Sequence, residues 1–146
     1  MKKRRNAQNE KPDTLVAVSR EHPLSGRSSV PFRALAGEKF IFTHAHHYAN
    51  TRLSHCCREA GFTPNVYYET AEISYTAKLV AANQGIFLLP SLPLSTSAFS
   101  EDKVSFLKIE ENPRIFSINL IKKKGKTLSR GASLLYQYLL ETLGGK

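Results

Sequence analysis

The sequence predicts an α/β fold in which a mostly parallel sheet is flanked by helices. Short, continuous apolar runs are typical of strands that are covered on both faces. Between these runs apolar residues recur at helical spacing, and strands that alternate with helices imply crossover connections and a parallel sheet. The 146 residues, of which 41% are hydrophobic, suffice for one globular core and are too few for two.

The expected elements follow one another in a regular order up to residue 90. Four apolar or β-branched runs predict strands, at residues 15–18, 40–42, 66–68 and 86–89. Two apolar stripes at helical spacing predict helices, one over residues 50–60 and one over residues 73–81. Asn50 or Thr51 is suited to cap the first helix, Gly61 suits the left-handed position past its end, and Pro64 forbids its continuation.

After residue 90 the pattern changes. Residues 91–102 are rich in Ser and Pro and are expected to form a loop that can include one short helical turn. Strands are expected at residues 104–109 and 115–121. The stripe of a final amphipathic helix consists of Leu134, Leu135, Tyr138, Leu139 and Leu143.

The net charge of +9 raises the question of nucleic-acid binding. Two basic runs carry much of it, Lys2-Lys3-Arg4-Arg5 and Lys122-Lys123-Lys124-Gly125-Lys126. Neither run is interleaved with aromatic residues, and the sequence has no zinc-finger spacing and no helix-turn-helix. A solvated leader with a charged turn is therefore favoured. Salt-sensitive, non-specific affinity for nucleic acid remains the alternative, and deletion of residues 1–12 would reveal it.

Composition also excludes several classes of protein. No apolar run is long enough to cross a bilayer, and the basic first residues lack the apolar stretch of a secretory signal. Cys56 and Cys57 are adjacent, which rarely satisfies disulfide geometry, so a reducing cytoplasm is expected. The serines lie in no nucleophile-elbow context, and no phosphate-binding glycine loop is present, so the chain is expected not to be an enzyme.

Several local signals together resemble a known family. They are, in chain order, Glu21-His22-Pro23-Leu24, Leu35-Ala36-Gly37-Glu38, Ala60-Gly61-Phe62-Thr63-Pro64 and the run from residue 79 to Pro90. In this order and spacing they resemble the effector-binding domain of LysR-type transcriptional regulators. That resemblance implies two α/β lobes like those of type 2 periplasmic binding proteins, joined by crossing strands, with a small ligand in the cleft between them.

The resemblance also implies a division of the chain. Residues 1–12 would be a basic flexible leader, residues 13–112 the crossing strands and one complete lobe, and residues 113–146 a remnant strand and helix of the other lobe. On this interpretation the domain is truncated and lacks the DNA-binding helix-turn-helix. One departure from the family lies at Asn83-Gln84-Gly85, where Gly-x-Gly is usual, but Asn tolerates the left-handed conformation that the turn needs.

The segment from Thr43 to Asn50 is the candidate ligand site. It connects a strand end to a helix start at the carboxyl edge of a parallel sheet, where such folds bind ligands, and a helix start favours an anion. Thr43, His44, Tyr48 and Asn50 offer groups for orientation, and the resemblance adds Ser74 at the start of the next helix. A surface loop without a ligand remains an equal alternative.

A metal site is not expected, although four of the five histidines lie close to Cys56 and Cys57. Both cysteines belong to the apolar stripe of a helix, where reduced cysteine acts as a small hydrophobe, and the His-x-His-His run lacks the paired spacing of a structural site. No cofactor is expected either.

The predicted function is therefore binding rather than catalysis. The chain is interpreted as an incomplete, cytoplasmic effector-binding domain of a LysR-type regulator, with a small-molecule partner such as a carboxylate. Self-association or pairing with a full-length regulator is expected, because a strand edge and an apolar helix face would lack their neighbours. No sequence-specific DNA contact and no membrane contact are expected. The alternatives are a free-standing anion-binding protein outside transcription and an inactive product of a truncated gene.

Overall fold

The computed structural model describes residues 4–44 and 47–143. The chain forms two compact units. The larger one, residues 13–116, is called the core unit here, and the smaller one, residues 1–12 with 117–146, is called the ribbon unit. Among the described residues, no helix has both the length and the apolar character needed to span a membrane.

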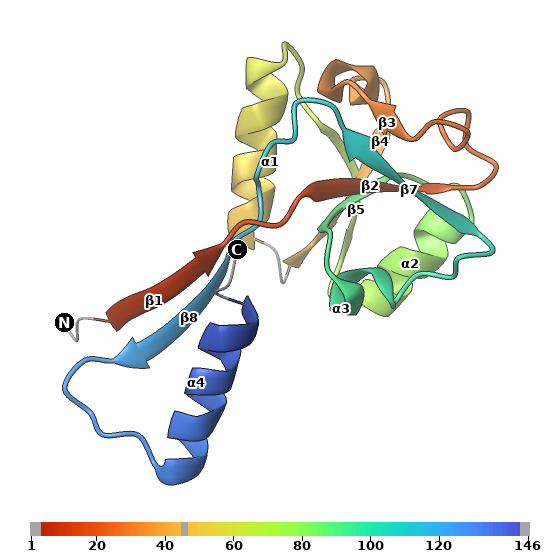
Figure 1. Ribbon diagram of the computed structural model, residues 1–146. Coiled ribbons are helices and arrows are strands. Elements are labelled where there is room, and N and C mark those ends of the chain that lie inside the picture. The colour runs from red at the N-terminus through yellow and green to blue at the C-terminus, as the bar shows by residue number, and fades with distance from the viewer. Residues whose placement is uncertain (1–3, 45–46, 144–146) are drawn as a thin grey trace. The chain divides into compact units, whose positions relative to one another are not determined.

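The core unit contains six strands, three α-helices and one 3-10 helix among its described residues (Figure 1). The strands are β2 (Thr14–Ser19), β3 (Ser29–Val30), β4 (Lys39–Thr43), β5 (Asn65–Thr70), β6 (Phe87–Pro90) and β7 (Val104–Ile109). The helices are η1 (Phe32–Leu35), α1 (His47–Glu59), α2 (Ile73–Ala81) and α3 (Pro93–Thr96). The predicted α/β class is confirmed.

The strands pair in the order β3-β7-β2-β6, and β4 pairs with β5. Ile86 joins the two sheets, because its N–H donates to the Lys39 carbonyl at 2.8 Å and its carbonyl accepts from Ile41 N at 2.9 Å. β4 and β5 are parallel, as are β3 and β7, and the bridge between Phe40 and Ile86 is parallel too. β2 runs antiparallel to both β6 and β7, which refines the expected mostly parallel sheet. Continuous apolar runs show burial on both faces but not the direction of pairing.

Burial on both faces of this sheet explains those runs. Val16 and Val18 belong to the hydrophobic cluster that includes Leu53 and Cys57 of α1, whereas Ala17, between them, belongs to the cluster beneath α2. α1 and α2 accordingly cover opposite faces (Figure 1). Because successive strand side chains point to opposite faces, the runs at residues 40–42 and 86–89 are buried throughout and the run at 15–18 is buried except for the half-buried Leu15, whereas the run at 66–68 in β5 is largely exposed. Each large apolar side chain buried in this way contributes about 1.5–3 kcal/mol.

The two helix ends singled out in the sequence have the expected backbone. Gly61, just past α1, has φ of +96°, and Asn83, past α2, has φ of +58°. Asn83 therefore adopts the left-handed conformation expected of it. The start of α1 was predicted wrongly, since the helix begins at His47 rather than near Asn50. The Asn50 side chain is engaged elsewhere, because its Nδ2 donates to the Thr43 carbonyl at 3.0 Å.

Two of the motif segments bind each other in the core unit. Leu24 N donates to His22 Nδ1 at 3.0 Å, so the other ring nitrogen, Nε2, carries the proton of the neutral ring. His22 Nε2 lies 2.8 Å from Glu38 Oε2. The imidazole therefore ties its own turn to the Glu38 segment, which gives this part of the resemblance a structural reason.

The ribbon unit is built from strands β1 (Arg4–Glu10) and β8 (Ile118–Lys123), which pair antiparallel, and helix α4 (Arg130–Leu143). Most of the leader that was expected to be flexible is thus strand β1. The hydrogen-bonding edge of β8 supplies its partner, and a polar sequence without β-branched residues gives no hint of such pairing. The strand predicted at residues 115–121 starts later than expected, because β8 begins at Ile118. Ile115 lies in the core unit instead, where it is 1% exposed.

Much of the apolar stripe predicted for helix α4 is exposed, which agrees with the expectation that this helix face lacks its neighbours. Tyr136, which is 8% exposed, is its buried aromatic residue, and the Lys122 ammonium lies 4.8 Å from the centre of its ring. Leu134, Leu135 and Tyr138 of the predicted stripe are all more than half exposed. Leu139 is half-buried, and the Leu143 side chain lies outside the described part of the chain.

Candidate functional site

A small pocket lies at the carboxyl ends of the parallel strands β4, β5 and β6. These strands end at Thr43, Thr70 and Pro90. The pocket has a volume of about 190 Å³ and is lined by Thr43, Ala71, Ile73, Phe87, Leu89, Pro90, Leu94 and Ser95. A mainly apolar lining with a few polar groups at this edge is typical of ligand sites in α/β folds.

Thr43 is the most informative residue in the lining. It is only 2% exposed, yet its Oγ1 has no hydrogen-bond partner among the described residues. Thr70 and Thr76 in the same core unit are also buried, but their hydroxyl oxygens lie 2.6 Å apart in a hydrogen bond, and Thr76 Oγ1 is 3.2 Å from the Glu72 carbonyl. Leaving a buried hydroxyl unpaired costs about 1–3 kcal/mol. Such a group is a site where a ligand would gain a hydrogen bond.

Of the other residues predicted from the sequence, Asn50 contacts Thr43. Its side-chain amide donates to the Thr43 carbonyl, as described above, and so ties α1 to the end of β4. Asn50 is not part of the pocket lining. Its place supports a role in positioning Thr43 rather than in contacting a ligand inside the pocket.

His44, Tyr48 and Ser74 lie outside the lining. His44 Nε2 is 3.6 Å from Glu69 Oε2, with both side chains exposed. Tyr48 is 71% exposed. Ser74 Oγ lies 3.4 Å from Glu72 Oε2, also at the surface. Thr43 is therefore the only one of the five predicted site residues that the described structure brings into this pocket.

Sequence reasoning missed most of the apolar lining. The sequence analysis interpreted Phe87, Leu89 and Pro90 only as a buried strand and its end. Because parallel strands end at the same edge of a sheet, these residues could have been predicted to lie near Thr43. Leu94 and Ser95 lie on the four-residue helix α3, which corresponds to the short helical turn allowed within the loop expected over residues 91–102. Their Ser- and Pro-rich surroundings gave no helical periodicity.

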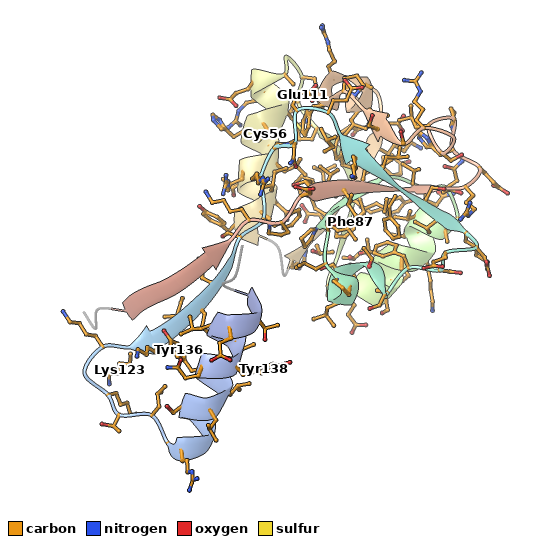
Figure 2. The ribbon with its side chains drawn as sticks, in the orientation of Figure 1. Cys56, Phe87, Glu111, Lys123, Tyr136 and Tyr138 are labelled. Atoms are coloured by element: carbon orange, nitrogen blue, oxygen red, sulfur yellow. The ribbon has the colours of Figure 1, made fainter. Side chains whose placement is uncertain are left out.

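A larger hollow of about 480 Å³ lies elsewhere in the core unit. It is lined by Phe32, Arg33, Cys56, Glu59, Ala60, Glu111 and Pro113, and Figure 2 shows two of these residues, Cys56 and Glu111. Glu111 already accepts a hydrogen bond from Phe32 N at 2.7 Å through Oε2. Because this hollow lies away from the carboxyl ends of the strands and its glutamate is engaged, we assign the candidate site to the smaller pocket.

The two cysteines are poorly suited to thiolate chemistry. Burial raises the pKa of the Cys56 thiol, and the nearby Glu59 carboxylate raises it further. Burial raises the pKa of Cys57 to about 12, with a smaller contribution from Cys56. The thiolate is the nucleophile and the metal ligand, so both groups are held in their unreactive form near neutral pH.

The metal cluster suggested by the sequence is described only in part. His46 and the side chain of His47 lie outside the described residues. Within the part of the chain that is described, no three side chains of His, Cys, Asp or Glu are grouped so that they could hold a metal ion.

The fold and the pocket define a class of protein. A mixed sheet between two helical layers, crossed by antiparallel strands and with a pocket at its carboxyl edge, is a lobe like those of type 2 periplasmic binding proteins. Residues 12–144 match the family model described as the LysR substrate binding domain. The chain belongs to this family.

Comparison with individual proteins agrees with this assignment. The chain is 32% identical over 129 residues to the uncharacterized HTH-type transcriptional regulator YybE of Bacillus subtilis, covering 88% of this chain and 42% of YybE. It is 30% identical over 114 residues to the DNA-binding transcriptional dual regulator OxyR of Escherichia coli, covering 78% of this chain and 37% of OxyR. The chain thus spans about four-tenths of the length of these relatives.

A solved structure shows the same fold. The regulatory domain of Synechocystis CcmR, solved in complex with 2-PG, matches with a TM-score of 0.76. The match covers 98% of this chain and 67% of that domain at 21% identity. At this level of identity the comparison establishes the fold.

Proposed function

We propose that this chain binds a small-molecule effector at the pocket beside Thr43, as the effector-binding domain of a LysR-type transcriptional regulator. The single observation that carries the proposal is the buried Thr43 hydroxyl, which lines the pocket without a partner among the described residues. Membership of the LysR substrate-binding family supports it. The chain then acts in the cytoplasm by binding rather than by catalysis.

The ligand class that suits this pocket is a small carboxylate or related anion. The Thr43 hydroxyl can donate to such a group, and helix α1 begins four residues after Thr43, where its dipole favours negative charge. The match to a domain solved with 2-PG is consistent with a small ligand in this fold. The pocket has a volume of about 190 Å³, whereas typical ligand sites have roughly 300–1,000 Å³. We therefore propose that a second protein surface, facing this pocket, completes the enclosure of the ligand.

A redox role is the natural rival, because one relative is named OxyR and closely similar ones are named hydrogen peroxide-inducible genes activators. The thiols argue against transferring that role to this chain. Both cysteine pKa values are raised by burial, and Cys57 is completely buried. Oxidation follows thiolate character and exposure, and neither cysteine combines the two.

The proposed partners in transcription follow from the relatives, which are named as transcriptional regulators. We propose that the chain self-associates or pairs with a full-length regulator. The exposed Leu134, Leu135 and Tyr138 of α4 support this, because adjacent exposed apolar residues favour association. Sedimentation of the full chain as a strict monomer at all concentrations would contradict self-association.

Ligand binding is tested by thermal unfolding with a panel of small anions, for example acetate, malate, benzoate and inorganic phosphate. A ligand present at a hundred times its Kd stabilises the folded state by about 2.7 kcal/mol, which is readily seen as a rise in Tm. Thr43→Val should abolish the rise, because it removes only the hydroxyl. The matched control is Thr63→Val, at an exposed threonine outside the pocket.

The outcomes separate the possibilities. Stabilisation that survives in Thr43→Val places the ligand elsewhere, and a broad panel without any shift in the unmodified chain argues for an unoccupied surface loop. Hydrogen exchange in the presence of the anion that raises Tm locates the binding site, because bound anion should slow the exchange of the amides of residues 43–50.

A further inference from the structure

The net charge of the chain is concentrated in the ribbon unit. Residues 1–12 and 117–146 contain eleven Lys and Arg against two acidic residues, Glu10 and Glu141, a net charge of +9. The core unit contains ten Lys and Arg against ten Asp and Glu, a net charge of zero. The whole excess therefore belongs to the smaller unit, and most of it has no carboxylate of the same unit to balance it.

The strand register brings the two basic runs together. In the antiparallel pairing of β1 with β8, Arg4 lies opposite Lys123 and Arg5 lies opposite Lys122. Like charges directly opposite in a ribbon are destabilising. Arg4, Arg5 and residues 122–126 are called the basic ribbon end below. Its two segments are more than a hundred positions apart in the sequence, so their meeting is visible only in the fold.

The described lysines at this end are accessible. Lys123, Lys124 and Lys126 are exposed, and Figure 2 shows Lys123 at the end of β8. Lys122 is half-buried, and its ammonium is the group that lies over the Tyr136 ring. A concentration of cations with at least three accessible lysines attracts polyanions.

We propose that the basic ribbon end binds the phosphate backbone of nucleic acid without sequence preference. Lys and Arg that neutralise phosphates release condensed counterions, which drives this kind of binding. The exposed Lys123, Lys124 and Lys126 lie at the end of β8 and in the turn that follows it, where an extended polyanion can reach them. Contacts to phosphate position a protein but carry no sequence information.

The composition of α4 favours nucleic acid over a membrane surface as the partner. A helix that lies in a membrane interface combines an apolar face with a polar face rich in Lys and Arg. α4 has the exposed apolar residues, but between Arg130 and Leu143 its charged residues are only Arg130 and Glu141. The cations lie on the strand pair and its turn, where they can follow an extended polyanion.

The expected strength depends on salt in a defined way. For about four phosphates neutralised on duplex DNA, the logarithm of the binding constant falls with the logarithm of salt concentration with a slope of about −3.6. Raising the salt from about 50 to 200 mM should therefore weaken binding roughly a hundredfold. Each lysine removed should reduce the steepness of this slope by about one.

The test measures binding of the full chain to a fluorescein-labelled DNA duplex of random sequence by fluorescence anisotropy, over this range of salt. The first variant carries Lys123→Gln, Lys124→Gln and Lys126→Gln, and keeps Lys122 because of its contact with Tyr136. The second variant carries Arg4→Gln and Arg5→Gln. The matched control carries Arg27→Gln, Lys103→Gln and Lys108→Gln, which removes three exposed charges from the core unit. Circular dichroism and thermal unfolding check that every variant is folded.

The proposal expects both ribbon variants to lose at least about tenfold in affinity at 50 mM salt, with a shallower slope, while the control stays close to the unmodified chain. Equal losses in the control and in the lysine variant would mean that overall charge alone matters, and would overturn the site. Full affinity in the arginine variant would overturn the joint role of the two runs. Cosedimentation with vesicles containing phosphatidylserine, without DNA binding, would overturn nucleic acid as the partner.

Discussion

Replacing Thr43 by Val separates the stability of the core unit from its proposed function. The change exchanges a hydroxyl for a methyl group of similar size and keeps the β-branched shape that suits strand β4. Thr43 is 2% exposed, and its Oγ1 has no hydrogen-bond partner among the described residues. Phe87 and Leu89 line the same pocket, so the new methyl group would have apolar neighbours.

The magnitude follows from the unpaired hydroxyl. Burying it without a partner costs about 1–3 kcal/mol, and the substitution removes that cost. We expect the free energy of unfolding to rise by about 1–2 kcal/mol and Tm by roughly 4–8 °C, taking about 4 °C per kcal/mol for a domain of this size. A stabilised variant that no longer binds its ligand is the usual result of removing a polar group kept for function.

Urea titration followed by circular dichroism measures the change, and Thr76→Val is the matched control. The Thr76 hydroxyl is hydrogen-bonded to Thr70 and to the Glu72 carbonyl, so its removal should lower the free energy of unfolding by about 1–2 kcal/mol. The two substitutions are chemically identical and should have opposite signs. If Thr43→Val destabilises the chain as much as Thr76→Val does, the Thr43 hydroxyl has a partner and the reasoning fails.

Two further predictions concern packing and pH. Gly85→Ala should destabilise the chain by about 1–3 kcal/mol in urea titrations, because the new Cβ would lie 2.8 Å from the Lys39 carbonyl oxygen. Gly37→Ala is the control, and it should be neutral or slightly stabilising because there is open space around its Cβ. Equal effects of the two substitutions would contradict the packing at Gly85. Cys57 has a folded-state pKa of about 12, above its ordinary value, so the unfolded chain releases the thiol proton first and stability should fall as pH rises from about 9 towards 12. Cys57→Ala should flatten this part of the pH profile, and rapid labelling of Cys57 by a thiol reagent in the folded chain near neutral pH would contradict its burial.

The sequence by itself determined the longer strands and the two long helices of the core unit. The apolar runs around Val16, Phe40 and Leu88 correspond to strands β2, β4 and β6, and the stripe through Leu53 and Cys57 corresponds to α1. These signals are local, because burial on both faces of a sheet and the period of a helix are written into consecutive residues. The left-handed Gly61 and Asn83 were predictable for the same reason. The order of the motifs also sufficed to suggest the LysR family, to which the chain belongs.

The tertiary structure alone decided which residues meet. Thr43 comes together with Phe87 and Leu94 because three strands end at one edge of the sheet, whereas Tyr48, five residues after Thr43 in the sequence, is exposed. Arg4 lies opposite Lys123 because the edge of β8 accepts β1, although nothing in either segment predicts the other. Contacts between residues far apart in sequence depend on strand pairing and register, which local periodicity leaves open.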